Sequence, residues 1–159
     1  MYLLFFGCIY GAMYTRIPTR KLKKIITLGK LDSSKHVYDL GAGYGRIGLT
    51  AAESGAHVTL VEIDHAKVFW LKRVIQTNLS SPMTRYHRFN VDLVKDNVLN
   101  VDLSDGDVLY AYLSPSLMNS LSKRNMKSGA LLISVQHPVK DWTPVFADLK
   151  DKIYVYKIK

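Results

Sequence analysis

Residues 37–46 read VYDLGAGYGR, an apolar run that leads into three glycines at alternate positions. The apolar run predicts a buried strand at His36–Leu40. A helix is predicted after it, at Tyr44–Ser54, and Gly55 ends this helix. Glycines allow a tight turn and let the backbone approach a ligand closely. The start of a helix offers free N–H groups to a polar or anionic ligand. This order of elements favours a nucleotide-binding turn.

A second acidic residue, Glu62, follows at a distance that suits a ribose. It ends the next predicted strand, His57–Ile63, and lies 21 residues after Gly41. About 20 residues are expected between a glycine loop and a carboxylate that binds ribose hydroxyls. Strand, loop, helix, strand and terminal acid together are more specific than glycines alone. The alternative is a tight strand–helix turn with an incidental acid.

Asp39 discriminates among the nucleotides that such a loop binds. A dinucleotide fingerprint that starts at Gly41 needs a glycine where Arg46 stands, and no G-x-x-x-x-G-K-[ST] phosphate loop is present. An acid two residues before the first glycine repels a phosphate, but it binds an ammonium group or orders the loop that does. S-adenosyl-L-methionine has an amino-acid end and an adenosine ribose, so it satisfies both Asp39 and Glu62.

Strands and helices alternate along most of the remaining sequence. Further helices are predicted from Pro18 to Gly29, at His65–Leu79 and at Pro115–Arg124, and further strands at Arg85–Val91, Asp107–Leu113, Ala130–Val135, Val145–Ala147 and Ile153–Ile158. The last two strands have no helix between them, which predicts an antiparallel edge. The predicted fold is α/β: a Rossmann-like three-layer sandwich with a mostly parallel seven-stranded sheet and an antiparallel C-terminal edge strand.

Length and composition predict a single domain over residues 1–159. Apolar residues make up 48% and charged residues 22%, which excludes disorder, collagen and coiled coil as descriptions of the whole. Cys8 is the one cysteine and the five histidines share no ligand-like spacing, so no metal site is predicted. A reducing, cytoplasmic setting fits this cysteine usage.

The net charge of +9 is concentrated near the N-terminus. Residues 1–38 hold seven basic residues against Asp32 alone, which makes +6. The charge predicts either a solvated helix face or a docking surface for an acidic macromolecule such as nucleic acid. Residues 1–14 carry no charge and are too short to span a bilayer. We expect residues 1–30 to cover the substrate side of a cofactor-binding core, 31–159; a shallow membrane anchor is the alternative for residues 1–14.

These motifs resemble the class I S-adenosylmethionine-dependent methyltransferases over nearly the whole chain. The resemblance implies that Asp39 and the loop backbone hold the methionine end of the cofactor, and that Glu62 binds the ribose. It also implies that Ile63 or Asp64 lies near the adenine and that Asp92, just past the third predicted strand, contacts the adenine amine. A helix cap is an equal explanation for Asp92. The cofactor-binding residues implied are Asp39, Gly41, Ala42, Gly43, Tyr44, Glu62, Ile63 and Asp92.

Finer motifs resemble the archaeal broad-specificity protein-lysine methyltransferases and their mitochondrial eukaryotic relatives. Residues 38–52, YDLGAGYGRIGLTAA, match the loop of that family. Residues 14–19, YTRIPT, resemble its Y-V-P-T-P motif, with two extra residues before Pro18 and with Arg20 in place of the second proline. Three later segments resemble the family in the same order: YLSPS (112–116), DWTP (141–144) and IYVY (153–156).

The segment Ser114-Pro115-Ser116-Leu117 bears on the substrate. Enzymes that methylate planar amines of bases often carry [DNS]-P-P-[FYW] here, and this chain lacks the second proline and the aromatic. A lysine amine instead needs to be neutral and in line with the methyl group, which a narrow apolar tunnel favours. Tyr14, Tyr44 and Tyr112 are candidate tunnel walls, with ordinary packing as the alternative. The candidates are therefore catalytic Tyr14, Tyr112 and Ser114, and substrate-binding Pro18, Thr19 and Pro115.

The sequence thus favours a protein-lysine N-methyltransferase whose partners are proteins with accessible lysines. An RNA or DNA methyltransferase is the first alternative, because the basic N-terminal region suits phosphate contacts. A non-catalytic module that binds adenosylmethionine is the second. Intact Asp39, Gly41, Gly43 and Glu62 weigh against that module.

Overall fold

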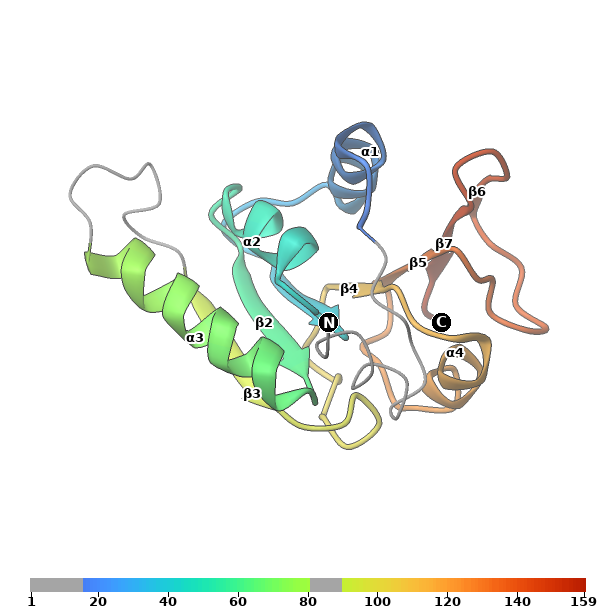
Figure 1. The fold of residues 1–159 in the computed structure, drawn as a ribbon. Helices are drawn as coiled ribbons and strands as arrows, with labels where there is room; N and C mark the ends of the chain where they lie inside the picture. Colours follow the sequence, from blue (N-terminus) through green and yellow to red (C-terminus); the bar gives the residue numbers. More distant parts are fainter. Residues whose placement is uncertain (1–15, 81–89) are drawn as a thin grey trace.

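A seven-stranded sheet forms the centre of the structure, a computed structural model that describes residues 16–80 and 90–159 (Figure 1). Its strands follow the spatial order β3-β2-β1-β4-β5-β7-β6. The strands are β1 His36–Leu40, β2 His57–Glu62, β3 Val91–Lys95, β4 Val108–Ala111, β5 Leu131–Val135, β6 Phe146–Asp148 and β7 Ile153–Lys157.

Strands β3, β2, β1, β4 and β5 are parallel, whereas β7 runs antiparallel to both β5 and β6. The expected antiparallel C-terminal edge is therefore present, with β7 inserted between β5 and the outermost strand β6. Since β6 and β7 form a hairpin, no crossover helix is needed between them. The predicted Rossmann-like fold is confirmed.

Helices cover both faces of the sheet. The first face carries α1 Thr19–Gly29, α2 Arg46–Ala52 and α3 His65–Ser80, which bury Ile25, Ile47 and Leu71 against it. The second face carries α4 Pro115–Leu121, which buries Met118 and Leu121. Successive strand residues point to opposite faces, so Val37 and Tyr38 join different core clusters.

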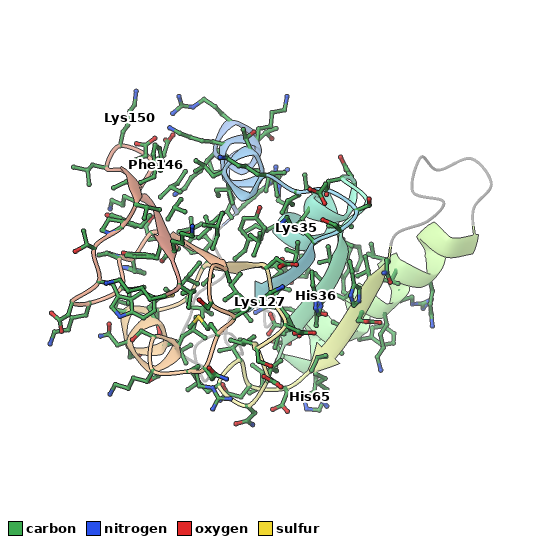
Figure 2. All side chains as sticks on the ribbon, turned by 180° about the vertical axis from the view of Figure 1, so that it is seen from behind. Lys35, His36, His65, Lys127, Phe146 and Lys150 are labelled. Carbon is green, nitrogen blue, oxygen red and sulfur yellow. The ribbon has the colours of Figure 1, made fainter. Side chains whose placement is uncertain are left out.

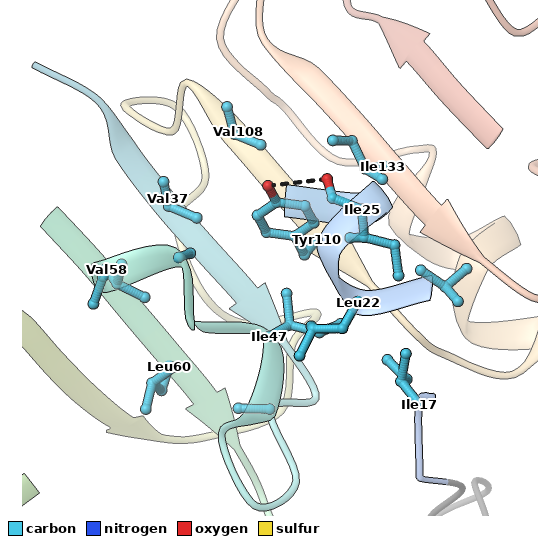
Figure 3. Packing of buried hydrophobic residues seen from close by; sticks show 14 of the residues in the cluster. Ile17, Leu22, Ile25, Val37, Ile47, Val58, Leu60, Val108, Tyr110 and Ile133 are labelled. Atoms are coloured by element: carbon cyan, nitrogen blue, oxygen red, sulfur yellow. Dashed lines mark hydrogen bonds between the residues drawn. The ribbon is translucent and has the colours of Figure 1, made fainter. Parts of the chain in front are cut away.

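Gly29 lets α1 lie close to the middle of the sheet. A Cβ atom at Gly29 would lie 2.2 Å from the hydroxyl oxygen of Tyr110 on β4. Tyr110 is fully buried, and its hydroxyl donates to the backbone oxygen of Ile25 in α1 at 3.4 Å (Figure 3). Burial raises the pKa of this phenol well above its usual value. The absence of a side chain at Gly29 thus sets how closely α1 packs.

Ion pairs join α1 to the β6–β7 hairpin. Lys24 pairs with Asp148 and, at 3.4 Å, with Asp151, while Arg20 pairs with Asp151 at 3.0 Å. Figure 2 shows Phe146 and Lys150 of this hairpin beside α1. Part of the positive charge near the N-terminus is therefore neutralised within the fold, rather than left free for a partner.

The third predicted strand is displaced along the chain. β3 begins at Val91, where the sequence predicted the strand to end, and it continues to Lys95. Residues 1–15 and 81–89 lie outside the described part, and with them Tyr14 and most of the predicted 85–91 strand. No helix within residues 16–80 and 90–159 is long and apolar enough to cross a membrane.

Candidate active site

Three polar segments meet at the carboxyl ends of the central strands. Leu40 of β1 pairs in register with Val61 of β2 and Ala111 of β4. The segments that follow these strands are therefore neighbours: the glycine loop, residues 62–64 and residues 112–115. Parallel α/β sheets bind their ligands at this edge. The sheet thus brings together most of the residues that the sequence singled out.

The glycine loop turns through a backbone conformation that favours glycine. Gly41, Gly43 and Gly45 have φ angles of 75°, 61° and 77°. The N–H groups of Gly41 and Ala42 both donate to the Val61 oxygen at 2.9 Å, which fixes the loop to β2. A Cβ at Gly41 would also lie 2.8 Å from a methyl carbon of Leu113. Other residues would therefore strain the turn and crowd the segment after β4.

Asp39 is buried directly beneath this loop. The residue is 3% exposed, and its Oδ2 accepts a 2.7 Å hydrogen bond from the Gly48 N–H in α2. Burial raises the pKa of Asp39 to about 7, and the nearby Glu62 carboxylate adds to the rise, while the Gly48 bond opposes it. A cation placed next to Asp39 would therefore be favoured strongly, since it would relieve the cost of ionising a buried acid.

Glu62 organises the backbone around it. Its Oε2 accepts from Gly43 N–H at 2.7 Å, and its Oε1 accepts from Ile63 and Asp64 N–H groups at 2.9 Å each. These three bonds tie the glycine loop to the β2–α3 turn. A carboxylate has about four acceptor positions, so about one remains for a ligand hydroxyl.

Ser114 begins α4 on the opposite side of the loop. The Ser114 Oγ accepts a hydrogen bond from the Leu117 N–H at 3.4 Å and lies 3.2 Å from the Ser116 Oγ. Pro115 follows at the first helical position. Serine as N-cap and proline at the first turn are the usual start of a helix. Ser114 is half-buried and Pro115 is exposed, so this turn lies at the surface beside the carboxyl ends of the strands.

A hydrogen bond from Arg46 joins the start of α1 to the start of α2, next to the glycine loop. The guanidinium of Arg46, the first residue of α2, donates to the Thr19 Oγ1 at 3.1 Å. Pro18 is exposed at the N-cap of α1, and its oxygen accepts the Leu22 N–H at 2.9 Å. Tyr112 is partly buried against the first core cluster. The predicted substrate-side residues that the structure describes thus lie around one edge.

The structure contradicts the position expected for Asp92. This residue lies inside β3 opposite Thr59 of β2, near the amino ends of the strands, and its Oδ2 is 2.8 Å from His57 Nε2. Glu62 pairs with Lys95, three residues further along, so Asp92 is roughly 10 Å from the binding edge. The prediction was wrong because it ended the strand four residues too early.

Asp96 occupies the place that had been expected for Asp92, directly after β3. Its Oδ1 accepts from the Asn97 N–H at 2.6 Å and from Asn100 Nδ2 at 2.8 Å.

Gly48 is a second residue that the prediction missed, since its N–H donates the hydrogen bond that holds the Asp39 carboxylate. Its position inside the predicted helix, nine residues after Asp39, was the available signal. A Cβ at Gly48 would lie 2.2 Å from a Leu60 methyl carbon.

A known protein family matches this arrangement. The ANTKMT methyltransferase domain family matches residues 39–146, which include Asp39, the glycine loop, Glu62 and the Ser114 turn. The chain belongs to this family. It is therefore an S-adenosylmethionine-dependent methyltransferase.

The relatives of this methyltransferase are named for different substrates, protein lysine in one case and RNA in two others. A protein-lysine N-methyltransferase of Saccharolobus islandicus is 24% identical over 143 residues, 82% of this chain and 80% of its own length. The ribosomal RNA small subunit methyltransferase A of Bifidobacterium adolescentis is 28% identical over 128 residues. These residues are 76% of this chain but 42% of that protein. An RNA methyltransferase of Salinibacter ruber, solved with S-adenosyl-L-homocysteine, shares the fold with a TM-score of 0.79, 24% identity and coverage of 91% and 94%.

The residues of the methyltransferase fit its cofactor. The buried Asp39 carboxylate suits the ammonium of the methionine end, and the remaining acceptor position of Glu62 suits a ribose hydroxyl. The positive φ angles of the loop expose backbone rather than side chain at the carboxyl edge. Within residues 16–80 and 90–159, no group of three or more His, Cys, Asp or Glu side chains is arranged to hold a metal ion.

Proposed function

We propose that the protein is a protein-lysine N-methyltransferase. The observation that carries the proposal is the Ser114 turn. Ser114 caps α4 with its own side chain, and Leu117 supplies the N–H for that cap. Leu117 stands at the position where the [DNS]-P-P-[FYW] motif carries its aromatic residue, so the segment 114–117 offers no ring on which a flat base would stack. The lysine methyltransferase relative, similar over most of both chains, supports the same substrate class.

The residues divide the work as follows. Bound S-adenosylmethionine supplies a methyl group on a positively charged sulfur. Asp39 and the glycine loop hold its methionine end, Glu62 its ribose, and Ile63 and Asp96 flank the adenine. Tyr112, Ser114 and Tyr14 border the acceptor amine, and Pro18, Thr19 and Pro115 contact the substrate around it. A reducing cytoplasm is the setting we assign to this reaction.

Catalysis then rests on position and desolvation. The substrate lysine first loses its proton to water. Its neutral nitrogen then forms the new bond to carbon as the bond between carbon and sulfur breaks, and the methylated lysine leaves as an ammonium ion. Orientation of two reactants at about 3 Å supplies most of such a rate enhancement. Half-buried Tyr112 and the buried Leu113 provide the apolar surroundings that keep a lysine amine neutral.

The test uses tritiated S-adenosylmethionine and a cell extract divided into nuclease-treated, protease-treated and acetylated portions. A lysine methyltransferase labels the nuclease-treated extract, and loses its label after protease or after acetylation of lysines. Mass spectrometry should then locate methyl-lysine. The Asp39→Ala variant is the inactive control. Label that nuclease removes would overturn the proposal.

RNA is the second candidate acceptor, because two relatives are named as RNA methyltransferases. The nuclease-treated portion decides between the two. Cofactor binding by calorimetry without any label would instead favour a non-catalytic module.

A further inference from the structure

Three large aromatic side chains are exposed next to the glycine loop. Tyr44 in the loop is 45% exposed, and Trp70 and Phe69 in the first half of α3 are 52% and 63% exposed. The rings of Tyr44 and Trp70 meet edge to face with 6.3 Å between their centroids. The neighbours Val68 and Leu71 bury the inner side of the same helix. The three rings therefore lie outward although the helix already has an apolar inner face.

The surroundings of these rings are positively charged. The guanidinium carbon of Arg73 lies 5.5 Å above the centre of the Phe69 ring, and Lys72 is exposed beside it. Residues 65–80 contain no Asp or Glu. The preceding acid, Asp64, accepts from the Ala66 and Lys67 N–H groups and lies 3.7 Å from the Lys67 ammonium. Nothing within α3 itself neutralises Lys72 and Arg73.

We propose that this α3 surface, formed by Tyr44, Phe69, Trp70, Lys72 and Arg73, binds single-stranded nucleic acid. Exposed rings offer faces on which unpaired bases stack, and adjacent cations bind the phosphates between them. Arg73 above Phe69 shows that a ring of this surface already accepts a cationic neighbour. The proposal concerns docking, and it does not depend on which acceptor the active site methylates.

The pattern of α3 favours nucleic acid over a lipid surface. A helix that lies in a bilayer interface presents a long apolar stripe. The outward side of α3 changes from Phe69 and Trp70 to Arg73, Gln76 and Thr77 within two turns. A short aromatic patch followed by polar and basic residues suits one or two stacked bases and their phosphates. The patch borders the glycine loop, so a bound strand would extend away from the active site along α3.

The two tryptophans of the chain allow a direct test. Trp142 contacts Tyr156 and is partly buried, so Trp142→Phe leaves Trp70 as the one remaining tryptophan. We expect a 12-nucleotide oligouridylate to quench the fluorescence of that variant, since a stacked base quenches indole emission. Trp70→Phe, which retains Trp142, should show no such quenching. Vesicles with 30% anionic lipid provide the competing probe.

Affinity is measured in parallel by fluorescence anisotropy with labelled oligouridylate. Phe69→Ala with Trp70→Ala should weaken binding at least about ten-fold. Lys72→Gln with Arg73→Gln should lower the slope of log affinity against log salt by about 1–2. The controls lie in and beside the β6–β7 hairpin, at the other end of the sheet from β3, and Figure 2 labels Lys150 among them. They are Val145→Ala with Leu149→Ala, which are 65% and 76% exposed, and Lys150→Gln with Lys152→Gln.

Two results would overturn the proposal. One is equal affinity of the α3 variants and their matched controls for the oligouridylate, which would mean general attraction to a basic protein. The other is a blue shift of Trp70 emission with anionic vesicles but no quenching with oligouridylate, which would assign the surface to a membrane. Methyl transfer to protein lysine is measured in a separate assay. A negative result in that assay would not affect the conclusion about oligouridylate binding.

Discussion

The Asp39 carboxylate accepts a 2.7 Å hydrogen bond from the backbone N–H of Gly48, and both residues are buried. Asp39 is the penultimate residue of β1 and Gly48 lies in α2, so this bond joins the strand and the helix on either side of the glycine loop. Because burial raises the Asp39 pKa to about 7, the bond also holds an acid whose charge depends on pH near neutrality.

Cofactor affinity should therefore rise with pH. Below pH 7 a proton must leave Asp39 before the ammonium of the cofactor is bound, which costs up to about ten-fold in affinity per pH unit. Calorimetry at pH 5.5, 6.5 and 7.5 should show this trend and proton release on binding. Asp39→Asn keeps the Gly48 bond through its carbonyl oxygen but removes the charge, so it should bind weakly with no such trend. A variant with the wild-type pH profile would contradict the role of Asp39.

The same substitution should change stability in the opposite direction. An acid whose pKa is raised in the folded protein binds its proton more tightly there, so stability falls as pH rises from about 4 to 7. Asp39→Asn removes that loss. Its melting temperature without cofactor should exceed the wild-type value more at pH 8 than at pH 5. Equal differences at the two pH values would argue against an ionisable buried Asp39.

Glu62→Gln should destabilise the protein by about 1–3 kcal/mol even without cofactor. Both oxygens of the Glu62 carboxylate accept hydrogen bonds from backbone N–H groups, those of Gly43, Ile63 and Asp64. Glutamine replaces one of these oxygens by an –NH₂ group, which cannot accept, so at least one of the three bonds is lost. Urea unfolding measures the effect. Glu53→Gln, an exposed position after α2, is the matched control and should change little.

Gly29→Ala should destabilise the protein, because the new methyl group would clash with the Tyr110 hydroxyl. Overpacking of this kind costs about 1–3 kcal/mol. Tyr110→Phe removes the hydroxyl, so the double variant should lose less stability than the sum of the two single variants. A strictly additive double-mutant cycle would contradict the contact.

Lys24→Ala should lower the melting temperature by a few degrees in low salt and by less in 0.5 M NaCl. Lys24 pairs with Asp148 and Asp151, and partly exposed ion pairs are screened by salt. Lys23→Ala, on the exposed side of α1, is the control and should have no salt-dependent effect.

The sequence predicted the turn of the glycine loop well because the signal for this turn is local. Alternating glycines report backbone conformation, and all three loop glycines do have positive φ angles. Asp92 was misplaced for a physical reason. β3 lies at the edge of the described sheet and is only partly buried, so its apolar pattern is weak and its bounds are hard to locate. The pairing of Lys24 with Asp148 spans 124 residues, and no local pattern reports it.

The insertion of β7 between β5 and β6 also has a consequence for biosynthesis. β5 gains its second neighbour from residues 153–157, and α1 gains its acidic partners from residues 148 and 151. A nascent chain that has emerged only to Val135 therefore exposes one side of a buried, apolar strand and has an untethered first helix. We expect such a chain to remain unfolded, or bound by a chaperone, until residue 157 has emerged from the ribosome.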